Sequence, residues 1–273
     1  MKTTLLVDAD LYAFRAMSAA EEEEEWDDDV WTLTCDHKKA REMYFASVAR
    51  AERLTGAEHI VHCFSDSTNW RKTLNPSYKA NRKKVRKPVG YLEFVAKLQK
   101  DVAKAYVRPT LEADDILGIL STHPTLISGR KVIASLDKDM KTIPGWLFDG
   151  EDVYEVTPEA AERYHMSQTL SGDAVDNYPG CPGMGKQRAE EAVSPPTMLV
   201  PYEHELKRGP RKGQTETRYT EEPTDDLWAA VVSRFVAAGQ TEEDALLNAR
   251  LARICQYTDY DFKKKEVILW QPS

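Results

Sequence analysis

The sequence predicts an α/β protein built on a mainly parallel sheet. Three short, largely apolar runs are typical of buried strands, and stretches with helical periodicity lie between them. The runs cover residues 3–7, 60–64 and 131–136. Each run is followed closely by an acidic residue: Asp8, Asp66 and Asp137. Ligands of such sheets bind beyond the carboxyl ends of the strands, so one site can collect all three carboxylates. The simpler explanation is three unrelated turn aspartates.

Length and composition set the broad class of the protein. The chain has 273 residues, enough to bury a full core as one large domain or two smaller ones. Charged residues make up 30% and apolar residues 41%, which suits a soluble globular enzyme. No apolar run approaches the length of a membrane span and the N-terminus lacks a signal-peptide pattern, so we expect no membrane partner. The four cysteines form no CxxC pair, which favours a reducing compartment and argues against structural zinc.

Three helices are predicted in the first half of the chain. One spans residues 38–54, with Asp36 as its cap and Gly56 at its end. Its inner face is expected to carry Tyr44, Val48, Ala51 and Leu54. The second spans residues 91–106, and the third, residues 112–120, begins with an acidic cluster.

The composition shifts after about residue 150. Thr157 followed by Pro158 predicts the start of a helix that ends near residue 170. The elements expected after it are helices at residues 225–238 and 242–257 and a strand at residues 266–270. Residues 206–218 are polar and basic, which favours a mobile loop over a site.

The acidic cluster suggests a site for cations. Glu112, Asp114 and Asp115 lie within four residues, and like charges this close repel one another unless a cation lies among them. Alone, the cluster is also typical of a helix N-terminus, where the helix dipole favours acids. Further carboxylates come from Asp139, Asp173 and Asp176. Oxygen ligands of this kind suit Mg²⁺, and two ions ~4 Å apart can stabilise both oxygens of a phosphodiester displacement.

A glycine-rich turn at residues 179–185 precedes a helix that opens at Lys186. Backbone N–H groups in such a turn can point at a phosphate, which makes Gly183, Gly185 and Lys186 candidate DNA contacts. The turn alone is equally typical of a helix-to-helix connection. Because Asp173 and Asp176 lie just before it, we expect these aspartates to hold metal while the turn holds the same DNA strand.

The charge is unevenly distributed along the chain. The formal net charge is −8, yet residues 67–92 contain no acid and eight basic residues. These are Arg71, Lys72, Lys79, Arg82, Lys83, Lys84, Arg86 and Lys87. Tyr78 adds an aromatic ring for base stacking, so this basic stretch is expected to bind DNA, with a disordered basic loop as the simpler alternative. At the other extreme, residues 21–29 are acidic apart from Trp26 and are expected to form a solvated face or loop.

Together these motifs resemble the 5′-nuclease family: flap endonucleases, the 5′-nuclease domains of bacterial repair polymerases, and phage 5′→3′ exonucleases. The motifs follow one another in order over residues 1 to about 190. They are Val7-Asp8, Phe64-Ser65-Asp66, Tyr78-Lys79-Ala80-Asn81-Arg82, Glu112-Ala113-Asp114-Asp115, Asp137-Lys138-Asp139 and Gly172-Asp173 through Gly185. Segments such as Asn69-Trp70-Arg71-Lys72 and Ile268-Leu269-Trp270-Gln271-Pro272 resemble the exonucleases of T7-like podoviruses and extend the similarity over nearly the whole chain.

The resemblance implies a PIN-like catalytic core at residues 1–155 that includes a basic helical arch at about residues 67–92. For residues 156–273 it implies a helix–hairpin–helix module and C-terminal helices that pack back on the core. The implied metal ligands are Asp8, Asp66, Glu112, Asp114, Asp115, Asp137, Asp139, Asp173 and Asp176. Lys79 and Arg82 are then catalytic arch cations that reach the scissile phosphate. The expected DNA contacts are Arg15, Arg71, Lys72, Tyr78, Lys83, Lys84, Gly183, Gly185 and Lys186.

The resemblance also implies a function: a phage 5′→3′ exodeoxyribonuclease that uses Mg²⁺, with Mn²⁺ as a substitute and K⁺ at the hairpin turn. Its expected substrates are duplex DNA with 5′ ends, flaps or RNA primers, in replication, recombination and host DNA breakdown. Other phage replication proteins are expected partners, and the cytoplasm of the infected bacterial host is the expected location. Two positions depart from the family pattern. Asp10 stands where many relatives are neutral and stays outside the ligand set, and Ala80 replaces a frequent arch glycine.

Two other functions compete with this one. An aspartate-dependent phosphatase would use Asp8 and Asp10 as nucleophile and acid, but it leaves the basic stretch and the glycine-rich turn unexplained. A DNA-binding module without activity would bind in a salt-dependent way, yet the clustered acids would hinder binding unless metals occupied them. Metal-dependent DNA cleavage separates the three functions.

Overall fold

The computed structural model describes residues 2–272, with the backbone alone described at Lys83 and Lys84. The chain forms two compact units. Unit 1 contains the residues up to Thr73, Arg82–Pro158 and Ile254–Ile268. Unit 2 contains Leu74–Asn81, Glu159–Arg253 and the residues from Leu269 on. Residues 74–81 of the expected arch therefore belong to unit 2, and residues 254–268 of the expected C-terminal domain belong to unit 1.

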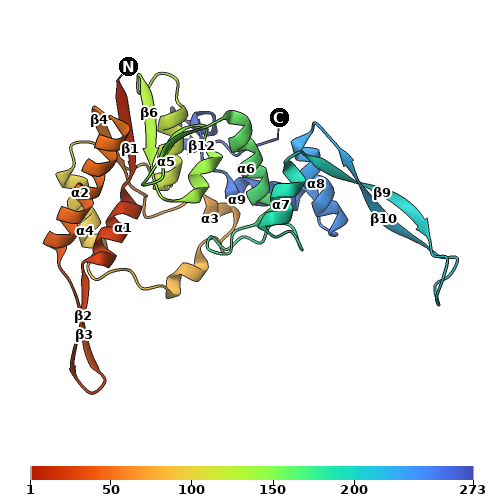
Figure 1. Ribbon diagram of the computed structural model, residues 1–273, viewed down its shortest axis with the longest axis horizontal. Helices are drawn as coiled ribbons and strands as arrows, with labels where there is room; N and C mark the ends of the chain where they lie inside the picture. The colour runs from red at the N-terminus through yellow and green to blue at the C-terminus, as the bar shows by residue number, and fades with distance from the viewer. Residues whose placement is uncertain (1, 273) are drawn as a thin grey trace. The chain divides into compact units, whose positions relative to one another are not determined.

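Unit 1 is built on the mainly parallel sheet that the sequence predicts (Figure 1). Within residues 2–272 its strands lie in the order β5-β4-β1-β6-β7-β8, and only β8 is antiparallel to its neighbour. The strands are β1 Thr3–Asp8, β4 His59–Cys63, β5 Ala105–Tyr106, β6 Arg130–Ala134, β7 Gly145–Phe148 and β8 Val153–Val156. In the central register Asp8 pairs with Cys63 and Val7 pairs with Ala134. The carboxyl ends of β4, β1 and β6 therefore lie side by side.

Helices cover both faces of this sheet (Figure 1). On one face, α1 Ala9–Ala19, α2 His37–Thr55 and α4 Tyr91–Asp101 bury their apolar sides against alternate residues of β1, such as Leu5 and Val7. On the other face, α5 Ala113–Thr122 contacts β1, β4 and β6. The predicted helix at residues 91–106 is too long, because residues 105–106 form the edge strand β5.

The predicted limits of α2 are confirmed. The Asp36 side chain accepts hydrogen bonds from Lys38 N and Lys39 N at the start, and Gly56 ends the helix with φ 65°. The prediction for Leu54 is wrong, because its side chain is 50% exposed while Tyr44, Val48 and Ala51 are buried. The remaining elements of unit 1 are short. They include η2 Lys138–Thr142, η3 Tyr257–Asp259, β11 Tyr260–Asp261 and β12 Glu266–Val267.

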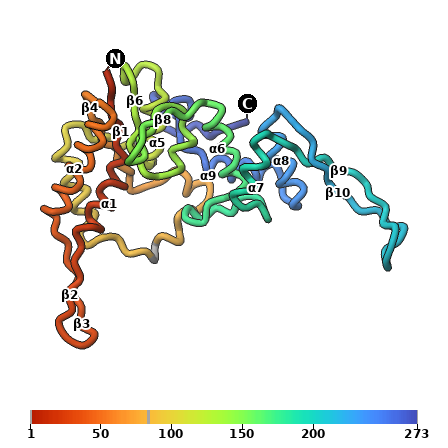
Figure 2. The backbone as a smooth tube through the Cα atoms, in the orientation of Figure 1, coloured from red at the N-terminus to blue at the C-terminus, as the bar shows by residue number. Residues whose placement is uncertain are grey.

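The acidic stretch at residues 21–29 is not a loop. Residues Glu21–Asp27 form β2, which pairs in antiparallel register with β3 Val30–Cys35 to make a projecting hairpin (Figure 2). Most of its side chains are exposed, so the expectation of a solvated face is met. Two anchors hold its base: Glu21 accepts hydrogen bonds from Arg86 at 2.8 and 2.9 Å, and Glu22 pairs with Lys39 at 2.9 Å.

The basic stretch contains two short helices, α3 Arg71–Leu74 and η1 Ala80–Lys84. Unit 2 is mainly helical, with α6 Pro158–Ser171, α7 Lys186–Val193, α8 Leu227–Ala237 and α9 Glu242–Ala252. Its β9 Thr197–Glu205 and β10 Thr215–Pro223 form an antiparallel hairpin of nine paired residues (Figure 1). The expectation of a loop at residues 206–218 is therefore wrong for its last four residues, which belong to β10. Within residues 2–272, none of the helices combines the length and apolar character needed to cross a membrane.

Unit 2 contains a buried histidine that is expected to make its stability sensitive to pH. His165 of α6 is 1% exposed, and its Nε2 donates to Ala249 O at 2.8 Å. Burial, and then the nearby Arg253 cation, lower the pKa of His165 to about 3 although the Ala249 bond opposes this. The unfolded chain binds a proton near pH 6.5 that the folded protein does not, so stability falls as pH falls from about 6.5 towards 3.

We expect His165→Gln, which keeps a donor and removes the titration, to reduce this loss. Between about pH 7 and pH 5 the wild-type free energy of unfolding should fall by about 2 kcal/mol more than that of the variant. Urea unfolding at both pH values, followed by circular dichroism, measures the difference. Equal losses in the two proteins would show that His165 titrates normally when folded.

Candidate active site

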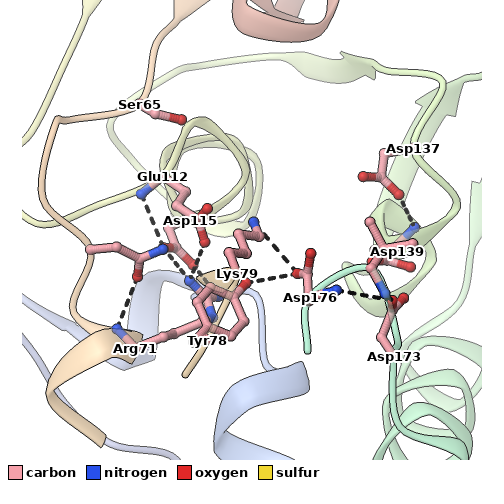
Figure 3. Close-up of polar contacts among 12 residues, drawn as sticks. Ser65, Arg71, Tyr78, Lys79, Glu112, Asp115, Asp137, Asp139, Asp173 and Asp176 are labelled. Atoms are coloured by element: carbon pink, nitrogen blue, oxygen red, sulfur yellow. Dashed lines mark hydrogen bonds and ion pairs between the residues drawn. The ribbon is translucent and has the colours of Figure 1, made fainter. Parts of the chain in front are cut away.

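Ser135 links Asp8 to Asp137 by hydrogen bonds where the adjacent strands β1 and β6 end. Asp8 ends β1 and caps α1, with its side chain accepting Leu11 N at 3.1 Å. Ser135, which follows β6, donates its hydroxyl to Asp8 Oδ2 at 2.7 Å and accepts Asp137 N at 3.1 Å. Asp137 in turn accepts Asp139 N at 3.0 Å and so caps η2 (Figure 3). The adjacent strand ends of β1 and β6 therefore bring these acids together.

Asp114 and Asp10 join the same neighbourhood from two helices. The thiol of Cys63, the last residue of β4, is fully buried. Its pKa is raised first by burial and then by the negative charges of Asp8, Asp10 and Asp114. Three carboxylates thus act on one sulfur at the end of β4. Asp10 is held in place by Ser65, whose backbone N–H donates to it at 2.7 Å.

The electrostatics of Asp8 fit a site for a positive ion. Burial raises the pKa of Asp8 to about 7, and the charges of Asp10 and Asp137 add to the increase while the Ser135 bond opposes it. A buried carboxylate with acidic neighbours is costly to ionise unless a cation compensates its charge. The oxygen donors gathered here are those that hard divalent cations prefer. Among the residues that the structure describes, no three acidic, histidine or cysteine side chains stand in metal-binding geometry.

Asp66 lies beyond the end of β4. Its Oδ2 accepts the Thr68 hydroxyl at 2.5 Å and Thr110 N at 2.9 Å, and these bonds lower its pKa. Asp139, in η2, lies 4.0 Å from the Lys138 ammonium. Both are partly exposed acids on the segments that follow strands of the sheet.

Asp115 occupies a different environment from the other predicted ligands. It is 0% exposed, and Arg71, itself 2% exposed, donates to its two oxygens at 2.8 and 2.9 Å (Figure 3). Trp70 Nε1 and Cys255 N donate at 3.0 and 3.1 Å. Burial alone would raise the pKa of Asp115, but the Arg71 cation and these bonds hold it below its ordinary value. Both oxygens are therefore bonded to protein donors, and a metal ion there would have to displace Arg71.

The same contacts correct the expectation that Arg71 binds DNA. Its guanidinium also bonds Glu112 Oε2 at 3.1 Å and lies 4.5 Å from the centre of the Trp70 ring. Glu112 caps α5 in a reciprocal capping box with Asp115. Arg71 is buried because it neutralises these two acids, so it is not available to a phosphate.

In unit 2, the predicted arch motif packs on the acidic turn. Tyr78 donates its hydroxyl to Asp176 Oδ2 at 2.8 Å, and the Lys79 ammonium lies 3.5 Å from the same oxygen (Figure 3). Asp173 accepts Val175 N and Asp176 N at 2.6 and 3.2 Å. Tyr78 is 2% exposed, with Leu251 and Ala252 in the same cluster. The expectation that its ring stacks on a base is therefore wrong for this conformation.

The glycine-rich turn connects α6 to α7 as expected. Gly183 has φ 78°, and Gly185 caps α7, which opens at Lys186. A Cβ at Gly183 or Gly185 would meet no atom within 4 Å, so these two glycines leave the backbone open on the outer side. Gly172 and Gly180 serve packing instead, because a Cβ on either would lie within 2.6 Å of the backbone of the other segment.

The remaining predicted DNA contacts are Arg15, Lys72, Lys83, Lys84 and Lys186, and Arg82 is the second predicted catalytic cation. Lys72, Arg82 and Lys186 are exposed, and the side chains of Lys83 and Lys84 lie outside the described part of the chain. Arg15 of α1 lines a cavity of about 820 Å³ in unit 1 together with Arg50, whose guanidinium donates to Gly150 O. Asp149 and Glu151 line the same cavity, so its border beside α1 carries charges of both signs.

Comparisons with known proteins identify the family. The family described as 5′-3′ exonuclease, N-terminal resolvase-like domain, matches residues 3–150. The exonuclease of Escherichia phage T7 is 40% identical over 285 aligned positions, which cover 99% of this chain and 94% of that protein. The chain belongs to the 5′-3′ exonuclease family. The exodeoxyribonuclease of Enterobacteria phage T3 is also 40% identical, over 99% of this chain and 93% of its own length.

Solved structures show the same fold as this 5′-3′ exonuclease family member. The flap endonuclease of bacteriophage T5, crystallised as a pseudo-enzyme–product complex with DNA and metal ions, matches with a TM-score of 0.61. The two chains are 16% identical, and the match covers 92% of this chain and 89% of the other. The α/β core is thus PIN-like, with a mainly parallel sheet and flanking helices.

Sequence reasoning missed several residues that organise the site of this 5′-3′ exonuclease family member. Ser135 and Ser65 orient Asp8 and Asp10, and Trp70 and Cys255 bond Asp115. Ser65 directly follows a predicted strand, so its position was a usable signal, whereas Ser135 lies inside the predicted run of residues 131–136 and is predicted there as part of the strand. No signal pointed to Cys255, because its backbone N–H makes the contact and lies 140 residues from Asp115.

Proposed function

We propose that this protein is a Mg²⁺-dependent 5′→3′ exodeoxyribonuclease that hydrolyses duplex DNA from 5′ ends to 5′-phosphorylated products. We extend the proposal to 5′ flaps and RNA primers. The observation that carries it is the gathering of Asp8, Asp114 and Asp137 around Ser135 and Cys63 in a chain of this family. The similarity to the phage T7 and T3 enzymes over nearly their whole lengths supports the reaction and its place in the infected host cell.

The residues divide into three groups under this proposal. The ligands of divalent ions would be Asp8, Asp66, Glu112, Asp114, Asp137 and Asp139 in unit 1 and Asp173 and Asp176 in unit 2. Such ions supply an activated water and neutralise charge on the reacting phosphate. Lys79 and Arg82 provide positive charge to the phosphate, and Asp115 positions α5 through its buried pair with Arg71. Mn²⁺ replaces Mg²⁺ in the same oxygen sites.

The DNA duplex is held by a separate part of the chain in this proposal. Backbone N–H groups from Gly183 to Lys186 face phosphates at the start of α7, with K⁺ as a further ion at this turn. Arg15 and Lys72 contribute exposed positive charge in unit 1. Contacts to phosphates fix position without reading sequence, so cleavage should be independent of base sequence.

The proposal is tested with duplex, flap and RNA·DNA substrates labelled at either the 5′ or the 3′ end. With Mg²⁺, we expect 5′-labelled duplex to release its label first and 3′-labelled duplex to shorten gradually. The products should be joined by a ligase because they keep 5′ phosphates. Removal of divalent ions with a chelator should stop the reaction. Degradation from the 3′ end, or an undiminished rate with the chelator, would rule the proposal out.

A further inference from the structure

The hairpin β9–β10 of unit 2 is drawn in Figure 1. The turn that joins its strands contains a group of positively charged residues. This turn, residues 206–214, is the tip of the hairpin. The tip contains four cations, Lys207, Arg208, Arg211 and Lys212, and no acid. All four side chains are exposed. Neither the proposed metal site nor the glycine-rich turn uses them.

The tip is a hydrogen-bonded turn. Leu206 N donates to Gln214 O and Gly213 N donates to Leu206 O, both at 2.9 Å. Between these two bonds, Lys212 N donates to Gly209 O at 3.1 Å. The hairpin therefore presents its cations at a defined end. Nine paired residues at about 3.4 Å each give a shaft about 30 Å long.

Charge is segregated along the hairpin. Acids are confined to the shaft, at Glu203, Glu205, Glu216, Glu221 and Glu222. Glu216 pairs with Arg218 at 2.8 Å and with Arg211 at 3.7 Å. Lys207, Arg208 and Lys212 lie beyond these acids. An anionic polymer would thus be attracted by the tip and repelled by the shaft.

We propose that the tip of the β9–β10 hairpin binds the phosphate backbone of duplex DNA outside the reacting end. Residues 206–214 contain lysine, arginine, glycine, proline and glutamine, with Leu206 as the one large apolar side chain. Protein interfaces are anchored by buried aromatic or aliphatic groups, and beyond the partly buried Leu206 this tip has none to offer. Clustered exposed cations without aromatic rings suit phosphates and give no base readout.

This inference rests on the proposed function, because it takes DNA as the substrate. The tip lies about 30 Å from the base of the hairpin in unit 2, a distance equal to about nine base pairs at 3.4 Å per step. The tip should therefore matter more for long duplexes than for short ones. It would keep the enzyme on its substrate between successive cleavages.

The test compares the variant K207Q/R208Q/K212Q with the control K263Q/K264Q/K265Q. The control removes the same charge from the exposed turn between β11 and β12 in unit 1. Fluorescence anisotropy without divalent ions measures binding to duplexes of about 12 and about 40 base pairs over a range of salt. Both variants should unfold at the wild-type temperature, since the replaced side chains are exposed.

We expect the tip variant to bind the long duplex at least about ten-fold more weakly than the control, with a salt slope shallower by about two to three. Its single-turnover cleavage rate at saturating protein should equal that of the wild type. If both variants bind the long duplex equally, the tip contacts no DNA and the inference is wrong. That result would instead be expected for a surface that recognises an acidic protein. Failure of the proposed function would instead appear as absent cleavage by the wild type.

Discussion

An Asp8→Asn variant is expected to cleave DNA about a thousand-fold more slowly than the wild type, a loss of about 4 kcal/mol in transition-state stabilisation. Asparagine caps a helix as well as aspartate does, so the bond from Leu11 N and the start of α1 are retained. The substitution removes the negative charge that Asp8 offers to a divalent ion. It does not remove any positively charged side chain that could contact DNA. Single-turnover cleavage of 5′-labelled duplex measures the rate, and anisotropy without divalent ions measures binding, which should be unchanged or tighter.

Asp10→Asn is the matched control. It lies two residues away and is held by Ser65 N at 2.7 Å, but it stands outside the proposed ligand set. We expect it to keep activity within about ten-fold of the wild type. An aspartate-dependent phosphatase would need Asp8 and Asp10 together as nucleophile and acid. Equal and complete loss in both variants would therefore count against the ligand assignment.

The sheet and the meeting of Asp8 with Asp137 could be predicted because both follow from local patterns. Buried parallel strands are continuous apolar runs, and neighbouring parallel strands end at the same edge. The two hairpins could not be predicted. Residues Glu21–Asp27 form a strand that is exposed on both faces, so its sequence carries no alternation of apolar and polar residues. The same holds for β10, where polar and charged residues fill most positions.

The role of Arg71 was hidden for a different reason. It lies in a stretch with eight cations and no acid, and in the sequence its charge cannot be distinguished from that of Lys72 or Arg82. Its partner Asp115 lies 44 residues away in another helix. Only tertiary structure shows that Arg71 is neutralised in a buried pair while Lys72 and Arg82 remain exposed. Lys79 and Arg86 also lie against acids. Composition therefore overstated the number of cations available to DNA.

An Asp115→Asn variant is expected to lower the free energy of unfolding by about 3–5 kcal/mol, because it removes the buried one of the two acids that neutralise the buried Arg71 charge and leaves only the partly exposed Glu112. Asparagine keeps the size of the side chain, so the loss reports charge and not volume. Urea unfolding at neutral pH measures it. Asp114→Asn is the matched control. Because Asp114 is partly exposed, the free energy of unfolding of this variant should differ from that of the wild type by less than about 1 kcal/mol, while its rate of DNA cleavage falls.

A second variant separates a positioning role for Asp115 from a ligand role. Arg71→Met combined with Asp115→Asn removes both charges and fills the space of the guanidinium, so most of the lost stability should return. The double variant should also recover part of the DNA cleavage that destabilisation of α5 removes. If Asp115→Asn alone unfolds like the wild type yet fails to cleave, Asp115 acts on the metal ions directly, and its pairing with Arg71 gives way when they bind.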